Sequence, residues 1–417
     1  MRDQTEKGRE LRKIAPALTL LVIAVLINYV DRGNLALAAP LLKVEWHLSA
    51  SQLGILFSSF FWSYMLLQFV VGWLVDRFSV TLVMALGFLV WSLSTAATGL
   101  VTGFITLLIM RLLLGVGESV MFPASSKICA QHLPERSRGF ANALIMASIR
   151  WGSALGTFGG GLLMARYGWR ATFIIIGLVS LLWLPAWQYW QPKKVDVPAV
   201  GRVREKPNVG AILRRRSFWG TSTGHFCGNY LLYFLISWLP YYLVQERHLS
   251  MANMAGTAGL LYAIDSFSAV ITGWVADRNI GKGRDPVVVR KSAMAVGFAI
   301  AAVSLMACAV AGPHTYFWCL LATGIGSGTA SSGPFAMGQT LAGPQAAGRW
   351  IGLQNGVANL SGVTGPALTG FLVDQTGHFG IALAVAALVA VVGALAWLFV
   401  VKRPTAAQWL EMEETFA

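Results

Sequence analysis

Charged residues are scarce in this chain. Only 12% of its 417 residues are Asp, Glu, Lys or Arg, whereas 56% are hydrophobic and the mean hydropathy is +0.61. Soluble globular domains carry about 25% charged residues. The composition therefore excludes an ordinary soluble enzyme or binding domain and indicates a membrane protein.

Cysteine is also rare, and its spacing fits neither a disulfide framework nor a metal site. The four cysteines are scattered through apolar segments, at Cys129, Cys227, Cys308 and Cys319. We expect them to be small buried hydrophobic residues. The sequence has no Walker phosphate loop and no nucleophile–base pattern, so ATP-driven pumping and hydrolysis are disfavoured. We predict no cofactor, no metal and no enzymatic activity.

Long apolar runs fill most of the chain. A membrane-spanning helix needs about 20 apolar residues, which predicts an all-α integral membrane protein with twelve spans. The first span is too long for the apolar part of a signal peptide, so we expect it to be retained. The spans lie near residues 15–40, 51–75, 80–100, 104–130, 138–165, 169–190, 217–244, 253–276, 289–311, 314–341, 348–373 and 380–401.

Basic residues outnumber acidic ones and give a net charge of +14. They are concentrated in alternate connections: with a cytoplasmic N-terminus, 24 lie on the inner side and four on the outer side. This bias predicts that both termini are cytoplasmic. The positive charge is thus explained by topology, and we expect a lipid bilayer and no nucleic acid as its surroundings.

One long polar stretch divides the chain. Residues 191–216 contain three prolines and eight basic residues and separate six predicted spans from six. We predict an N-terminal six-helix bundle over 1–190, a cytoplasmic basic linker over 191–216 and a C-terminal six-helix bundle over 217–417.

The two halves resemble each other in sequence. Gly-Trp-Leu-Val-Asp-Arg at 72–77 returns as Gly-Trp-Val-Ala-Asp-Arg at 273–278, an offset of 201. A Gly-flanked segment at 161–168 has a counterpart at 370–377, an offset of 209. Two matches in the same order predict a duplicated six-helix unit. Duplicated bundles of this kind rock about a site near the membrane midplane.

Twelve spans in a 6+6 split, with Gly-x-x-x-Asp-Arg closing spans 2 and 8, resemble the major facilitator superfamily over the whole chain. Three further motifs resemble its anion:cation symporter family. They are Tyr29-Val30-Asp31-Arg32-Gly33-Asn34-Leu35, Arg111-x6-Glu118, and Gly352-Leu353-Gln354-Asn355-Gly356-x2-Asn359-x2-Gly362-x2-Gly365-Pro366. The loop after Arg77 departs from the superfamily pattern, because it lacks the usual glycine and basic residues.

That family includes bacterial hexonate, hexuronate and aldarate importers and is related to vesicular glutamate and sialic acid carriers. The resemblance implies that Asp31 and Glu118 are proton sites and that Arg32 contacts the substrate carboxylate. It also implies a bacterial inner membrane location, and we expect a monomer.

Few ionisable residues lie within the predicted spans, where a charge costs at least a few kcal/mol. Arg111 and Glu118 are seven residues apart and share a helical face, about 10 Å apart along the axis, so each needs a partner from another helix. Pairing Asp31 with Arg111 and Arg32 with Glu118 would neutralise all four. The alternative is that this set only holds two helices together, although buried ion pairs are a poor source of stability.

Such a set can couple two ligands. Burial favours the neutral form of a carboxyl group and a nearby guanidinium favours its ionised form. A carboxylate whose arginine is taken by an anionic substrate therefore tends to pick up a proton. Binding of the substrate to the arginine frees the carboxylate for a proton, and protonation of the carboxylate frees the arginine for the substrate. This exchange is the basis of proton-coupled anion uptake.

Two further charges leave alternatives open. Arg150 lies in the middle of span 5, where it binds a second substrate carboxylate or pairs with Asp265 or Glu118. Asp265 in span 8 is a third proton site or a paired, buried acid.

Uncharged polar residues in both halves suit a ligand with many hydroxyl groups. The alternative for each of them is a hydrogen bond between helices. His225 and Tyr233 share a face of span 7 with Asn229, which is one of these polar residues. We interpret His225 as structural. The candidate substrate-binding residues are Tyr29, Arg32, Tyr64, Gln68, Arg150, Asn229, Tyr230, Ser331, Ser332, Asn355 and Asn359.

The leading hypothesis is a proton-coupled symporter that imports a sugar acid by alternating access. The sequence leaves open another carboxylate as substrate, such as an aromatic acid or a dicarboxylate. A proton-coupled efflux antiporter is disfavoured, because Gly156-Thr157 stands where such exporters carry Gly-Pro. A nutrient sensor that no longer transports is also disfavoured. Such sensors normally carry a long regulatory domain or tail, and the tail around residues 411–414 is short.

Overall fold

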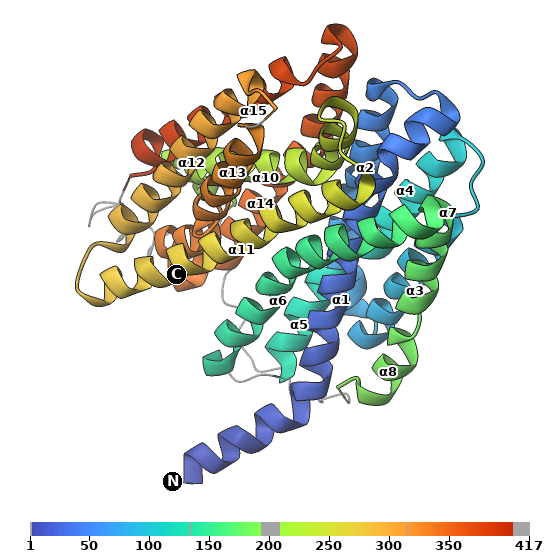
Figure 1. Cartoon of the computed structure of the whole chain (residues 1–417). Coiled ribbons are helices and arrows are strands. Elements are labelled where there is room, and N and C mark those ends of the chain that lie inside the picture. Colours follow the sequence, from blue (N-terminus) through green and yellow to red (C-terminus); the bar gives the residue numbers. More distant parts are fainter. Residues whose placement is uncertain (1, 133–134, 193–208, 314, 403–417) are drawn as a thin grey trace. The chain divides into compact units, whose positions relative to one another are not determined.

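The computed structural model describes the backbone of residues 2–132, 135–192, 209–313 and 315–402. Within these ranges, the side chains of 2–13, 68, 69, 72, 76, 130, 135–143, 146 and 343–348 are not described. The regular structure of the described ranges is entirely helical (Figure 1).

The described part of the chain contains α-helices and three short π-helices, labelled η. In chain order they are α1 (Arg2–Trp46), α2 (Ala50–Arg77), α3 (Val80–Thr98), α4 (Phe104–Glu118), α5 (Met121–His132), α6 (Glu135–Leu155), η1 (Gly156–Gly160), α7 (Gly161–Ser180), α8 (Trp183–Trp190), α9 (Val209–Leu213), α10 (Arg216–Tyr241), η2 (Tyr242–Glu246), α11 (Met251–Gly281), α12 (Pro286–Val310), α13 (Tyr316–Ala330), α14 (Pro334–Thr376), α15 (Gly380–Leu395) and η3 (Ala396–Val400).

In the described residues, the twelve predicted spans fall mainly on helical backbone. Eight segments in the described ranges are long and apolar enough to cross a membrane. One of them, Ala147–Trp190, covers most of the fifth predicted span and the whole of the sixth. A kink at Gly168 separates the two, and its φ of 77° is a conformation that glycine adopts readily. The protein is therefore a multi-pass helical membrane protein.

Two predicted spans are interrupted at corresponding places. The fourth breaks between α4, which ends at Glu118, and α5, which begins at Met121. The tenth breaks between α13 and α14, at Ser331–Gly333. Both breaks are short turns at which backbone hydrogen bonds persist, from the Ser119 N–H to the Gly115 carbonyl oxygen and from the Ser331 N–H to the Ser327 carbonyl oxygen. They lie next to two sets of candidate residues, Glu118 and the Ser331–Ser332 pair.

The contacts divide the chain into two compact units. The first contains residues 1–200 and 236–259, and the second contains 201–235 and 260–417. Residues 193–208, most of the predicted linker, lie outside the described residues.

In the first unit, a glycine stripe brings α1 against α6 and η1. A Cβ atom at Gly152 would lie 2.6 Å from the Leu26 carbonyl oxygen, and one at Gly156 would lie 2.8 Å from the Val30 Cα. The successive glycines thus meet successive turns of α1. This close packing holds the part of α1 that carries Asp31 and Arg32.

The segment 236–259 also packs within the first unit. The Lys43 ammonium donates a hydrogen bond of 2.5 Å to the Tyr241 hydroxyl. The rings of Phe57 and Trp238 meet edge to face, with centroids 5.2 Å apart.

In the second unit, α12 packs against α13 and α15. A Cβ atom at Gly297 would lie 2.3 Å from the Ala330 backbone nitrogen. The first unit repeats this crossing between α3 and α4, where a Cβ atom at Gly87 would lie 2.9 Å from the Gly117 carbonyl oxygen. These crossings are 210 positions apart in the chain, which supports the predicted duplication.

We expect Gly156→Ala to destabilise the protein by about 1–3 kcal/mol, because the added methyl group would collide with α1. Gly159→Ala is the matched control in the same π-helix, since a Cβ atom there has no neighbour within 4 Å. Thermal unfolding followed by size-exclusion chromatography measures both variants. Equal midpoints for the two would contradict the described packing of α1.

Candidate functional site

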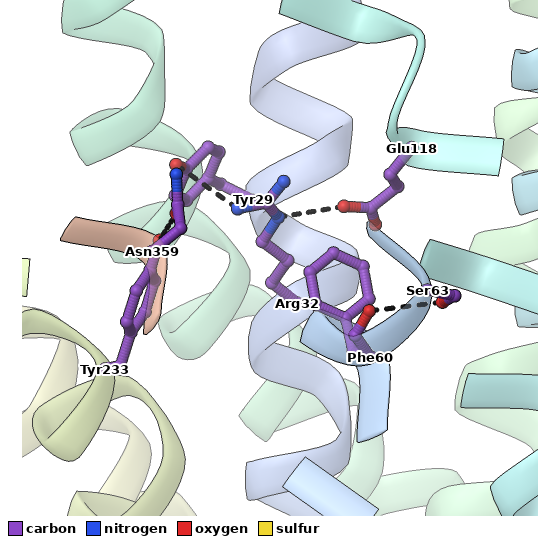
Figure 2. Close-up of polar contacts among 7 residues, drawn as sticks. All are labelled: Tyr29, Arg32, Phe60, Ser63, Glu118, Tyr233 and Asn359. Carbon is purple, nitrogen blue, oxygen red and sulfur yellow. Dashed lines mark hydrogen bonds and ion pairs between the residues drawn. The ribbon is translucent and has the colours of Figure 1, made fainter. Parts of the chain in front are cut away.

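A buried ion pair joins α1 to the end of α4. The Arg32 Nε atom lies 2.8 Å from Glu118 Oε2, and the side chains are 5% and 0% exposed (Figure 2). Removing two charges from water is costly unless they are paired with good geometry. The predicted pairing of Arg32 with Glu118 is therefore present in the structure.

Three aromatic rings surround the Arg32 guanidinium. Its central carbon lies 4.7 Å from the ring centroid of Tyr29, 4.9 Å from that of Phe60 and 4.8 Å from that of Tyr64. The Tyr29 hydroxyl also accepts a hydrogen bond of 3.4 Å from Arg32 Nη1. The rings hold the guanidinium by cation–π attraction, and we call Tyr29, Phe60 and Tyr64 the aromatic cage.

Local packing places the α2 part of this cage. Phe60 and Tyr64 are four residues apart and lie on one face of α2, with their rings stacked 5.3 Å apart. Ser63 donates a hydrogen bond of 2.8 Å to the Leu112 carbonyl oxygen, and a Cβ atom at Gly115 would lie 2.4 Å from the Phe60 carbonyl oxygen. This close crossing of α2 and α4 positions the cage beside Glu118.

Arg111 does not form the second predicted ion pair. Its Nε atom donates a hydrogen bond of 3.4 Å to the Leu56 carbonyl oxygen, and its guanidinium lies 5.2 Å from the Phe60 ring centroid. Among the described residues no ion pair joins it to Asp31. Arg111 still interacts electrostatically with Glu118, Arg32 and Asp31.

Asp31 is buried near Glu118 and Arg111, and its hydrogen-bonding neighbours are uncharged. It is 1% exposed, and its Oδ1 accepts a hydrogen bond of 3.3 Å from the Asn34 amide. Its Oδ2 makes no hydrogen bond, although the Thr95 hydroxyl of α3 faces the carboxyl group. A carboxyl group with these neighbours can hold a proton and donate it to a hydroxyl oxygen.

Glu118 also keeps one oxygen unused. Its Oε1 has no hydrogen-bond partner, and the side chain of Asn28, fully buried with both polar atoms unpartnered, faces it. Buried unpartnered polar atoms are uncommon and often mark water or function. The surroundings of Glu118 can therefore accommodate a change of partner.

Arg150 approaches the same cluster from α6. The Tyr29 hydroxyl interacts electrostatically with both Arg32 and Arg150. Tyr29 is thus a neighbour of two arginines from different helices. The side chain of Gln68, another candidate, lies outside the described residues.

The candidates of the second unit form a separate polar set. The Tyr233 hydroxyl donates a hydrogen bond of 2.9 Å to Asn359 Oδ1, and Asn359 Nδ2 donates one of 2.9 Å to the Asn355 carbonyl oxygen (Figure 2). Asn359 is therefore held by helix contacts on both sides. The Asn355 side chain is half-buried and makes no hydrogen bond within the described ranges.

The other candidate substrate-binding residues of this unit differ in their hydrogen bonds and their exposure. Tyr230 is 3% exposed and its hydroxyl has no hydrogen-bond partner, although Thr369 lies beside it. Ser331 and Ser332 hydrogen-bond to carbonyl oxygens one turn back, at the helix break. Asn229 is half-buried on α10.

Two ionisable residues of the second unit have local partners. His225 Nδ1 lies 3.3 Å from the Gln354 amide nitrogen, which also donates to the Pro334 carbonyl oxygen. This arrangement agrees with a structural role for His225. Asp265 is buried on α11 beside Tyr262.

The sequence did not single out Phe60, Thr95 or Asn28. Phe60 and Thr95 lie in apolar runs of α2 and α3 that read as ordinary membrane spans. The four-residue spacing of Phe60 and Tyr64 is the one signal that could have drawn attention to Phe60, since residues at this spacing share a helical face.

The sequence matches the model of the Major Facilitator Superfamily over residues 21–289 and 287–415. The chain belongs to this superfamily. Its members are membrane transporters, and the protein is accordingly a transporter and not an enzyme.

Several curated superfamily members are similar over nearly the whole chain. A hexuronate transporter of Bacillus subtilis is 30% identical over 91% of this chain and 93% of its own. A protein of Escherichia coli named "Probable galactarate/D-glucarate transporter" is 27% identical over 96% of both chains. A chloroplastic ascorbate transporter of Arabidopsis thaliana is 28% identical over 89% of this chain and 72% of its own.

Solved structures show the same superfamily fold. A bacterial homologue of the human lysosomal transporter Spinster, in an inward-facing and unoccupied conformation, has a TM-score of 0.75 and 20% identity over 97% of this chain and 98% of its own. The inward-facing, occupied structure has a TM-score of 0.73 and 18% identity over 96% of both chains. The twelve-helix prediction is thus confirmed at the level of the fold.

We expect Glu118→Leu to destabilise the protein by about 3–5 kcal/mol, because Arg32 then loses the carboxylate that balances its charge in an apolar site. The double variant Arg32→Met/Glu118→Leu should recover much of this loss, because neither charge remains. Chemical unfolding in detergent measures both.

The control is the ion pair of Arg290 and Asp277, in which the Asp277 side chain is 77% exposed and Arg290 Nη2 lies 3.8 Å from Asp277 Oδ1. Asp277→Leu should cost less than about 1 kcal/mol. If the Glu118→Leu variant is as stable as the Asp277→Leu variant, losing a partner from the buried pair costs no more free energy of unfolding than losing one from the surface pair.

Proposed function

We propose that this protein is a proton-coupled symporter that imports a sugar acid by alternating access. The location we propose is a bacterial inner membrane, with both termini in the cytoplasm. The observation that carries the proposal is the buried Arg32–Glu118 ion pair beside Asp31, a second buried acid.

The chemistry begins with Arg32. The aromatic cage contacts the guanidinium, and Arg32 Nε donates its hydrogen bond to Glu118. A substrate carboxylate has the same charge and the same geometry as Glu118, so it can accept that hydrogen bond in its place. Arg32 is the binding group for the substrate carboxylate in this proposal.

The displaced Glu118 then couples the substrate to a proton. A carboxylate that loses its cation in an apolar site takes up a proton, because its ionised form is costly there. Asp31 provides the second proton position, with Thr95 and Asn34 as its neighbours. Release of the protons on the inner side restores the ion pair and expels the substrate. With two protons and one monoanion, each cycle moves one net positive charge inward.

Two features support a sugar acid as the substrate. The relatives are named as transporters of hexuronate, galactarate, D-glucarate or ascorbate, all of them oxygen-rich anions. In addition, the second unit offers hydroxyl and amide groups, among them Tyr230 and Asn355, which can hydrogen-bond to sugar hydroxyls.

Arg150 is relevant to how many carboxylate groups the substrate carries. Its electrostatic interaction with the tyrosine that also contacts Arg32 supports a role in binding a second carboxylate, such as that of an aldarate. A dicarboxylate substrate is therefore the second candidate.

We expect Glu118→Gln to separate binding from coupling. The glutamine side chain does not titrate, so proton-driven accumulation in proteoliposomes should be lost, whereas exchange of substrate across the membrane should survive. Uptake of labelled D-glucuronate, D-gluconate and D-glucarate measures both activities. Loss of exchange together with intact binding would mean that Glu118 is not a coupling site.

A proton ionophore provides the control for the mechanism itself. Wild-type uptake should fall to the level of equilibration when the proton gradient is collapsed. Undiminished accumulation under these conditions would remove proton coupling from the proposal.

A thermal-shift panel should identify the substrate class. We expect at least one sugar acid to raise the unfolding temperature of the wild-type protein and to lose this effect in Arg32→Gln. Arg150→Gln should weaken D-glucarate binding by tenfold or more and leave D-gluconate binding within about twofold if Arg150 binds a second carboxylate. Stabilisation by aromatic acids alone would overturn the sugar-acid assignment.

A further inference from the structure

One aromatic ring lies beside two buried arginines. The Phe60 ring centroid is 4.9 Å from the Arg32 guanidinium carbon and 5.2 Å from that of Arg111. Phe60 is 1% exposed, and the two arginines are 7% and 6% exposed. Two positive groups therefore share one ring in a region shielded from water.

The two guanidinium groups repel each other, while the nearby Glu118 and Asp31 carboxyl groups attract Arg111 and oppose that repulsion. Repulsion between like charges is strong where water is excluded. The π-face of a phenylalanine carries negative charge density and attracts a cation, with more effect at desolvated sites. A ring shared by both arginines offsets part of the repulsion, and it adds no charge that would compete for either guanidinium.

The ring also leaves the hydrogen bonds of both arginines intact. Arg32 uses its Nε for Glu118, and Arg111 uses its Nε for the Leu56 carbonyl oxygen. Cation–π contact therefore holds each guanidinium without occupying the donor that these partners use. Among the described residues of the cage, Phe60 is the one whose ring lies against both arginines.

We propose that Phe60 is a positioning residue that fixes Arg32 and Arg111 at their separation, so that a substrate carboxylate engages Arg32 alone. If the ring were lost, Arg32 could shift when Glu118 leaves, and its donors would no longer be aligned with the incoming carboxylate. This inference rests on the proposed function, because it assigns to Phe60 a part in carboxylate binding.

A ring that merely fills space would give the same structure. The two roles differ in their dependence on the electron density of the ring. Successive fluorination of phenylalanine withdraws this density and changes the shape little, so a packing role is insensitive to it and a cation–π role declines step by step.

The test places mono-, di- and trifluorophenylalanine at position 60 of the full-length protein in lipid nanodiscs. Binding of D-glucuronate, D-gluconate and D-glucarate is measured by calorimetry. We expect affinity to fall with each fluorine, by roughly tenfold overall, and to fall to a similar extent in Phe60→Leu. Phe60→Tyr, which keeps an electron-rich ring, should stay within about threefold of wild type.

Phe88 is the matched control. It is fully buried in the same unit, and its ring packs against the rings of Trp91 and Trp183. The same fluorinated series at position 88 should leave affinity unchanged. An affinity at position 60 that is flat or rises with fluorination would overturn the inference.

A second measurement separates this inference from the proposed function. The unfolding temperature of the ligand-free protein should also fall step by step with fluorination at position 60 and not at position 88. If wild type binds none of the three sugar acids, the proposed function fails, and the positioning role in carboxylate binding fails with it. A graded fall in unfolding temperature would then still establish the shared cation–π contact, and a flat series would remove it.

Discussion

The buried contact between Arg32 and Glu118 is the interaction on which the rest of the site depends. A guanidinium and a carboxylate 2.8 Å apart, both removed from water, restrict how α1, α2 and α4 can pack around them. The aromatic cage, the Ser63 hydrogen bond to α4 and the close approach at Gly115 all bring groups to this point. Buried ion pairs are weak contributors to stability, and the proposed exchange of partners would give this pair a function beyond stability.

Much of the fold was predictable from the sequence, because membrane insertion is controlled by long apolar runs that hydropathy detects directly. The pairing of Arg32 with Glu118 was predictable as well, since few charges lie within the spans and each needs a complement. The helix break at Ser331–Gly333 does have a sequence signal, Ser-Ser-Gly-Pro at 331–334, although the predicted span ran across it. The break after Glu118 has no comparable turn signal in the sequence.

The surroundings of the charges were harder to predict. Charge balance favoured an Asp31–Arg111 pair, yet Arg111 binds the Leu56 carbonyl oxygen and lies over Phe60. Backbone carbonyls and ring faces are acceptors that residue counting does not include. Thr95 and Asn28 were missed for the same reason: a single hydroxyl or amide in an apolar run gives no sign of which carboxyl group it faces.

The glycine stripe between α1 and α6–η1 has a consequence for motion. At Gly152 and Gly156 the glycine backbone lies directly against the backbone of α1 at Leu26 and Val30. Side chains in a helix interface can change rotamer and so allow sliding, but backbone against backbone has no such freedom. We therefore infer that α1 and α6–η1 travel together as one stiff piece. Asp31 and Arg32 then keep their backbone reference frame throughout the transport cycle, and only bonds to their side chains have to be remade.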